Sequence, residues 1–332
     1  TLFCQLYKYG PMAGNSKSVV LAALVANGAI AILKFAGFLL TQSPAMLAET
    51  YHSLSDTGNQ VFLLIGIRYG SRERDREHPF GYGKAQFFYS FLVSVFLFGI
   101  AGWESAKHGY KAVMHGETTA VEGSVTIPVI AAEIPGVYVN YGVLLGAIVF
   151  ETYALIKARA AMQAEIEEKG YSGYVEAFRK TSRTTILTAL TEDTIALAGL
   201  GLALGGIFLT RWTGNYIFDA SAALLIGIML MGFALALAWE NKRLILGESL
   251  PADEERTLRG AVEGVDGVAS IVGFRTVYFG PEEILVTADI AFDDGLDTGG
   301  IDRAIADAEA RVREHNPDVV KVYVEPEVRP TG

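Results

Sequence analysis

The chain is poor in several residue types, and each shortage narrows its function. Cys4 is the single cysteine among 332 residues, which excludes a disulfide framework within the chain and a cysteine-rich zinc module. Neither HExxH nor GxxxxGK[ST] occurs, so the signatures of a zinc metalloprotease and of an ATP-binding phosphate loop are missing. Lysine and arginine number 27 against 37 aspartates and glutamates, and the net charge of −10 argues against nucleic acid as a partner.

Charged residues are also few as a class, and apolar residues fill most of the chain. Hydrophobic residues make up 51% of the sequence, charged residues make up 19%, and the mean hydropathy is +0.31. Since a helix needs about 20 mainly apolar residues to cross a bilayer, the composition predicts a polytopic membrane protein. We expect six transmembrane helices, at about 17–40, 45–69, 85–108, 138–160, 184–210 and 216–240.

The distribution of basic residues predicts the orientation of these spans. The connections 70–84 and 157–183 are rich in lysine and arginine, whereas the connections 41–44 and 116–137 have none. The positive-inside rule therefore places both termini in the cytoplasm. No cleavable signal peptide is expected, and the compact single-chain form suggests a bacterial inner membrane.

The residues after the last span have the composition of a soluble domain. Residues 251–264 favour a helix, 268–279 and 283–292 favour the two strands of a hairpin, 299–315 favour a second helix, and "VVKVYVEP" favours a closing strand. This order, αββαβ, is typical of a ferredoxin-like α+β domain. We therefore divide the chain into an N-terminal cytoplasmic segment at 1–16, a six-helix transmembrane domain at 17–245 and a cytoplasmic domain at 246–332.

Ionisable residues interrupt the second predicted span in the stretch "AETYHSLSDTGNQ" (48–60). His52 and Asp56 are four residues apart, so both lie on one helix face and can bind one divalent ion. Glu49 shares that face and Asn59 follows three residues after Asp56, which makes both of them weaker candidate ligands. Two ligands from one helix leave a tetrahedral site half filled, so another span must supply the rest.

The fifth predicted span offers Glu192 and Asp193 for that purpose. The alternative interpretation of His52 is a hydrogen-bonded interior residue, which is the more common role of a lone histidine. The alternative for Glu192 and Asp193 is a role in helix packing. Lys34, in the first span, is expected either to extend toward the headgroups or to pair with an acid. Asp219, near the outer end of the sixth span, is interpreted either as water-exposed or as functional.

Two segments resemble the cation diffusion facilitators, a family of divalent-metal exporters that usually exchange the metal for protons. They are "MLAETYHSLSDTGNQ" in the second span and "HPFGYGKAQFF" at the start of the third. The resemblance covers nearly the whole chain and implies a homodimer in which His52 and Asp56 bind the transported ion. Zinc is the commonest substrate in that family, with iron, manganese, cobalt and cadmium also represented.

The sequence departs from the common family pattern in its fifth span and in its last domain. Glu192 and Asp193 replace the usual His-x-x-x-Asp, with Ala189 four residues before Asp193, which resembles a branch with mitochondrial and bacterial members. These ligands make the site harder and less surely zinc-selective. The last domain has His315 as its single histidine, so dimerisation is a better expectation there than a binuclear zinc site.

The loop before the third span gives a further candidate site. Asp75 and His78 match positions that some family members use to bind a metal, but Tyr82 stands where another histidine would be expected. Asp75 and His78 are therefore weaker candidate ligands, for a partial metal site in this loop.

The sequence therefore predicts a metal/proton antiporter with no resident cofactor, whose partners are a divalent ion, protons, lipid and a second copy of the chain. A carrier for Fe²⁺, Mn²⁺ or Co²⁺ is the nearest alternative. A non-transporting metal sensor is a further one, and an intramembrane metal-dependent hydrolase is disfavoured by the missing HExxH.

Overall fold

A computed structural model describes residues 15–115, 124–127, 132–174, 176–177, 184–281 and 283–328. Contacts divide the chain between residues 64 and 65, 91 and 92, and 238 and 239 into two compact units. The first unit contains most of the long helices. The second contains residues 65–91 together with the chain from 239 onward.

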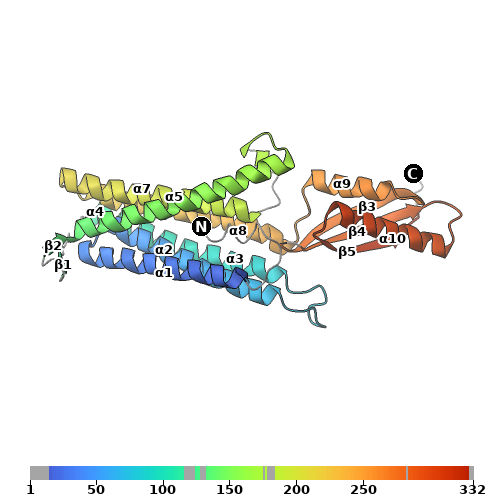
Figure 1. The fold of residues 1–332 in the computed structure, drawn as a ribbon, viewed down its shortest axis with the longest axis horizontal. Helices are drawn as coiled ribbons and strands as arrows, with labels where there is room; N and C mark the ends of the chain where they lie inside the picture. Colours follow the sequence, from blue (N-terminus) through green and yellow to red (C-terminus); the bar gives the residue numbers. More distant parts are fainter. Residues whose placement is uncertain are drawn as a thin grey trace. The chain divides into compact units, whose positions relative to one another are not determined.

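Long helices dominate the chain before residue 247 (Figure 1). Their bounds are α1 Asn15–Thr41, α2 Pro44–Gly70, α3 Lys84–Phe96, α4 Trp103–His115, α5 Gly136–Lys169, α7 Thr184–Thr213 and α8 Ile217–Leu246. A π-helical segment, η2 Leu97–Gly102, joins α3 to α4 without a break. Two short strands, β1 Ser124–Ile127 and β2 Ala132–Pro135, pair antiparallel before α5.

Four helical stretches among the described residues are long and apolar enough to cross a membrane. They are Lys84–His115, Gly136–Glu167, Leu190–Thr213 and Ile217–Leu246. In α1 the apolar stretch is shorter, Asn27–Thr41, and α2 carries the ionisable residues already noted across its 27 residues. The predicted helical transmembrane domain is thus confirmed, while the count of six spans stays a prediction.

Small residues let the helices of the first unit approach one another closely. A Cβ atom added at Gly227 of α8 would lie 2.3 Å from the backbone nitrogen of Ala106 in α4. One added at Gly109 of α4 would lie 2.3 Å from the backbone nitrogen of Leu224 in α8. Glycine is therefore required at both places, because a Cβ atom would clash with the facing backbone. Such close packing matters in a membrane, since apolar lipid gives helices little reason to associate other than close packing and polar contacts.

The start of α2 is held by a residue from α8. Ser43 precedes the helix and its hydroxyl accepts a hydrogen bond from the Met46 backbone N–H, as an N-cap does. Oδ1 of Asp219 accepts from the Ser43 hydroxyl (2.9 Å) and from the Ala45 backbone N–H (3.1 Å). The expectation that Asp219 is water-exposed is wrong, since it is buried where it satisfies these donors.

The second unit includes a small α+β domain that follows the predicted order. Its elements are α9 Ala252–Glu263, β3 Val268–Gly280, β4 Glu283–Phe292, α10 Thr298–His315 and β5 Val319–Pro326. The sheet order is β3-β4-β5, with β3 and β4 antiparallel and β4 and β5 parallel. Buried residues alternate along β4 at Ile284, Val286, Ala288 and Ile290, and they pack against the buried face of α10.

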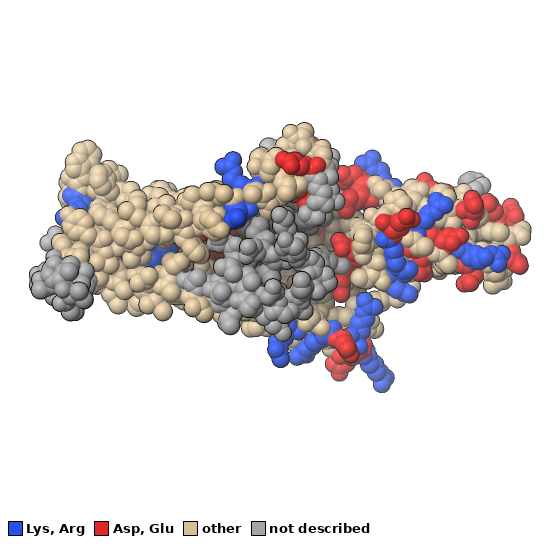
Figure 2. All heavy atoms as spheres, viewed as in Figure 1, with Lys and Arg blue, Asp and Glu red and all other residues tan. Residues whose placement is uncertain are grey.

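Surface charge differs between these parts of the chain. On the face drawn in Figure 2, the long helices of the first unit show few Lys, Arg, Asp or Glu side chains, and charges of both signs crowd the α+β domain. The first surface is typical of helices in contact with lipid, whereas the second is typical of a domain in water.

Candidate metal site on helix α2

His52 and Asp56 lie together on the buried face of α2. His52 Nδ1 is 3.6 Å from Asp56 Oδ1, and the side chains are 3% and 22% exposed. Neither ring nitrogen of His52 has a hydrogen-bond partner among the described residues. Buried polar atoms are nearly always satisfied, so the interpretation of His52 as a hydrogen-bonded interior histidine does not hold.

Glu49 lies on the same helix but is engaged with α1. Its Oε2 is 2.8 Å from the ammonium of Lys34, which also donates to the hydroxyl of Ser53 at 2.8 Å. Lys34 is 3% exposed and Glu49 is fully buried. Of the two interpretations of Lys34, pairing with an acid is therefore confirmed. In this arrangement Glu49 neutralises a lysine, and its predicted role as a ligand stays a prediction.

Acids from α5 and α7 lie near His52 and Asp56 but do not complete a metal-ligand cluster with them in the described ranges. Glu192 of α7 lies near enough to interact electrostatically with His52, and Asp193 does so with Asp56. Both acids are half-buried. No three of the His, Cys, Asp and Glu side chains in the described ranges come together as a metal cluster. The structure thus forms the His52–Asp56 pair, and the addition of Glu192 and Asp193 stays a prediction.

Glu151 of α5 is a neighbour of this site that the sequence reasoning did not assign. It interacts electrostatically with His52, Asp56 and Glu192. The signal available in the sequence was an ionisable residue within an apolar span, since such residues generally face a polar path. α5 packs against both α1 and α7, which explains how its acid reaches the others.

Asn59 lies in a different environment from His52 and Asp56. It is half-buried and lines an apolar cavity of about 310 Å³ between α2 and the α3–η2 segment, together with Leu54 and Phe62 of α2. Its role as a weak ligand stays a prediction, and the other residues that line the cavity are mainly apolar.

Asp75 and His78 form a turn in the loop between α2 and α3. Asp75 Oδ1 accepts hydrogen bonds from the backbone N–H groups of Glu77 (2.9 Å) and His78 (2.7 Å), and its Oδ2 accepts from the Tyr82 hydroxyl (2.5 Å). The Tyr82 hydroxyl and these N–H groups lower the pKa of Asp75, and the bond to Asp75 raises the pKa of Tyr82 to about 12. Both carboxylate oxygens are therefore already used, although His78 Nδ1 lies 3.7 Å from Asp75 Oδ1.

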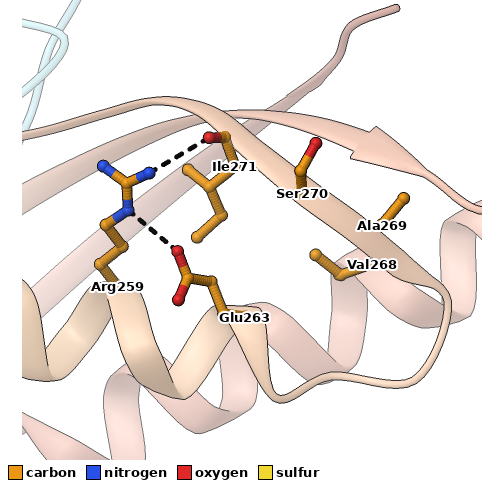
Figure 3. Close-up of a pocket in the computed structure, with 6 residues that line it drawn as sticks. All are labelled: Arg259, Glu263, Val268, Ala269, Ser270 and Ile271. Carbon is orange, nitrogen blue, oxygen red and sulfur yellow. Dashed lines mark hydrogen bonds and ion pairs between the residues drawn. The ribbon is translucent and has the colours of Figure 1, made fainter. Parts of the chain in front are cut away.

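The α+β domain has a shallow polar pocket between α9 and β3 (Figure 3). Arg259 spans it, donating to Glu263 at 3.1 Å and to the Ile271 carbonyl at 3.2 Å. His315 lies elsewhere, exposed at the end of α10, with its Nδ1 2.9 Å from the Arg311 carbonyl. The carboxylate in the pocket is thus paired with arginine, and the single histidine is not beside it.

Comparison with known proteins identifies the family of the chain. Residues 20–246, more than half of the chain, match the family model for the cation efflux transmembrane domain. The chain therefore belongs to the cation efflux family, the cation diffusion facilitators, whose members are transporters and not enzymes.

Individual relatives differ in how much of their length the chain covers. It is similar to the mouse proton-coupled zinc antiporter SLC30A9, mitochondrial, with 27% identity over 304 residues, which is 87% of this chain and 50% of that protein. The cation-efflux pump FieF of Serratia proteamaculans is 26% identical over 280 residues, covering 84% of this chain and 82% of the pump. The chain thus spans about half of the length of SLC30A9 and most of that of FieF.

Proposed function

We propose that the protein exports a divalent metal ion, with zinc the first candidate, in exchange for protons. The observation that supports this most is His52, whose buried ring nitrogens have no hydrogen-bond partner in the part of the chain that the structure describes and lie beside the Asp56 carboxylate. An imidazole and a carboxylate on adjacent helical turns are ligands for a borderline ion such as Zn²⁺. The name of the mouse relative, a proton-coupled zinc antiporter, supports the choice of ion and of coupling.

The exchange follows from competition for the same atoms. A metal ion binds the deprotonated forms of histidine and carboxylate, so its arrival from the cytosol displaces protons. On the outer side, protons re-occupy these atoms and the ion leaves. Imidazole changes its protonation near neutral pH, which suits a group that must hold either cargo in turn.

Completion of the site requires a further conformation. Glu192 and Asp193 interact with His52 and Asp56 electrostatically but do not form a cluster with them in the described residues. We propose that α7 brings one of these acids onto the ion when it binds. Alternating access would then be a shift between arrangements of α2 and α7.

Flux into proteoliposomes tests the proposal. Vesicles that contain separate metal and pH dyes would receive Zn²⁺, Fe²⁺, Mn²⁺ or Co²⁺, and wild type would be compared with Asp56→Ala, Glu192→Ala and Asp193→Ala. We expect saturable metal flux with opposite proton movement that is lost in Asp56→Ala. Whichever of Glu192→Ala and Asp193→Ala lowers flux more identifies the direct ligand.

The alternatives give different outcomes in the same assay. Saturable flux that is greatest for Fe²⁺, Mn²⁺ or Co²⁺ would identify a carrier for another ion. Metal binding without flux in either orientation of the protein would contradict transport and indicate a sensor. Asp75→Ala is the matched control, because both oxygens of the Asp75 carboxylate already accept hydrogen bonds within its loop.

We also propose that the protein is a homodimer in a bacterial inner membrane with both termini in the cytoplasm. Single cysteines introduced at Ser71 and Trp212, in a Cys4→Ser background, would test the orientation. A membrane-impermeant maleimide should label Ser71→Cys from the cytoplasmic side and Trp212→Cys from the opposite side. Labelling of both from one side would contradict the arrangement.

A further inference from the structure

Lys34 is a buried cation that the proposed exchange does not use. Its ammonium is 2.8 Å from Glu49 Oε2 and 2.8 Å from the Ser53 hydroxyl, and the lysine is 3% exposed. Taking a lysine and a glutamate out of water is unfavourable, and their attraction only partly offsets that cost. An intramembrane ion pair of this kind is therefore a candidate functional feature rather than a source of stability.

The ion pair adjoins the proposed metal ligands. Glu49 precedes His52 by three residues on α2, and Ser53, the other acceptor of Lys34, directly follows His52. The Lys34 charge interacts electrostatically with both His52 and Asp56. A divalent ion bound at His52 and Asp56 would be repelled by the same ammonium.

Glu49 is also held from the side of α7. A Cβ atom added at Gly199 would lie 2.6 Å from Glu49 Oε1, so any larger residue at that position would require the carboxylate to move. Glu49 Oε1 itself has no hydrogen-bond partner among the described residues. The carboxylate thus lies between Lys34 of α1 and the backbone of α7, with one oxygen still able to bind a cation.

We propose that Lys34 is a positioning and affinity-setting residue: its ammonium keeps Glu49 off the transported ion and weakens the binding of that ion at His52 and Asp56. The inference rests on the proposed function, because it concerns the same site. A carrier must release its cargo, so an extra carboxylate ligand would hinder turnover. Lys34 prevents this because its ammonium is covalently part of the protein and stays paired with the Glu49 carboxylate.

This role makes the two members of the ion pair act in opposite directions. Removing the ammonium frees a third acidic ligand and removes a repulsion, so metal binding tightens. Removing the carboxylate charge leaves the ammonium unneutralised, so binding weakens. Removing both charges restores the electrostatic balance, and binding returns close to that of wild type.

The test is Co²⁺ binding to the purified full-length chain, followed by d–d absorption and by competition with a chromophoric chelator at fixed pH. The variants are Lys34→Met, Glu49→Gln, the double variant, and the charge-keeping Lys34→Arg. We expect Kd to fall by about tenfold in Lys34→Met, with an altered spectrum from the added carboxylate, and to rise by about tenfold in Glu49→Gln. The double variant and Lys34→Arg should stay within about threefold of wild type, with its spectrum.

Flux adds a second readout for the same variants. In proteoliposomes Lys34→Met should lower both KM and kcat, because the ion binds more tightly and leaves more slowly. A merely structural role would instead weaken binding in both single variants and leave the cobalt spectrum of the remaining site unchanged. That result would overturn the inference, and so would a double variant as weak as Glu49→Gln, which would make Glu49 a direct ligand.

Asp56→Ala separates this inference from the proposed function. If Asp56→Ala abolishes binding and flux while Lys34→Met binds like wild type, the inference is wrong and the exchanger stands. If Asp56→Ala leaves Co²⁺ binding intact, the site itself is misplaced and the inference falls with it. Where Lys34→Met does not yield folded protein, the double variant against Glu49→Gln decides, since restored affinity supports the inference and unrestored affinity overturns it.

Discussion

The pairs His52–Asp56 and Asp75–His78 have nearly the same spacing, four and three residues, but opposite surroundings. The first is on α2, 3% and 22% exposed, and both imidazole nitrogens are without hydrogen-bond partners among the described residues. The second is in a loop, about half exposed, and its carboxylate accepts from two backbone N–H groups and a phenol. A pair of ligand-type residues can bind a metal when its atoms are left unused, and spacing alone does not reveal that.

Substitution of the two histidines should separate these pairs most clearly. His52→Ala should lower metal-driven flux by at least about 100-fold, since loss of even outer-shell partners of metal sites costs about 10–100-fold. His78→Ala should leave flux within about threefold of wild type. Flux into dye-loaded proteoliposomes measures both, and comparable losses in the two variants would show that the loop pair also binds metal.

A second prediction concerns the close packing of α8 against α4. Gly227→Ala places a Cβ 2.3 Å from the Ala106 backbone, which must move, whereas Gly232 in the same helix has nothing within 4 Å. We expect Gly227→Ala to lose about 1–3 kcal/mol of stability through overpacking, and Gly232→Ala to change it little.

Thermal unfolding in detergent, compared with wild type, measures this difference. An equally small shift of the midpoint for both glycines would mean that α4 and α8 separate at little cost.

A third prediction concerns the hydrogen bond between Asp75 and Tyr82 in the loop. The Asp75 carboxylate raises the pKa of Tyr82 to about 12, so Asp75→Asn should return this phenol toward about 10. The bond contributes stability that is fully present below the unfolded tyrosine pKa and is lost as the pH rises through the raised folded value. For Asp75, whose pKa is lowered, the contribution is present above the unfolded value and is lost as the pH falls through the folded one.

Ultraviolet titration of phenolate, with Tyr82→Phe as the reference, measures this change. His78→Ala is the control, since it keeps the Asp75–Tyr82 bond. A Tyr82 transition that stays near 12 in Asp75→Asn would contradict the assigned hydrogen bond.

The smallest expected effect concerns the aromatic contacts of the same loop. The Phe80 ring is 5.2 Å from that of Phe279 and 6.5 Å from that of Tyr323, both within the second unit. Phe80→Ala should lower the stability of that unit by about 0.5–1.5 kcal/mol, because aromatic pairs contribute about that much beyond burial. Chemical denaturation followed by intrinsic fluorescence measures it, with exposed Val328→Ala as a control expected to have no effect.

Several features of the fold follow from local patterns and were predictable. The αββαβ order of the last domain appears in β-branched runs and in helical periodicity, and β4 indeed buries alternate residues. The His52–Asp56 contact follows from the helical repeat alone. The long apolar helices likewise need only composition and length.

The partners across helices were not predictable in the same way. Lys34 could be assigned to an unnamed acid, but Glu49 becomes its partner only because α1 and α2 present them to each other. The role of Asp219 was ambiguous because the groups that donate to its Oδ1, in Ser43 and Ala45, lie more than 170 residues earlier in the chain. Glu151 had no assignment until α5 placed it among the other acids.

Two features can be predicted from the sequence: a face of acids and imidazole along one helix of a membrane protein, and an α+β domain that follows the helices. Both depend on the repeat of a single element, which is encoded locally. The tertiary structure alone decided which ionisable groups neutralise one another and which remain unpaired. Those outcomes depend on how helices rotate and pack, so that Glu49 is bound to Lys34 while the His52 ring is left without a hydrogen-bond partner in the described structure.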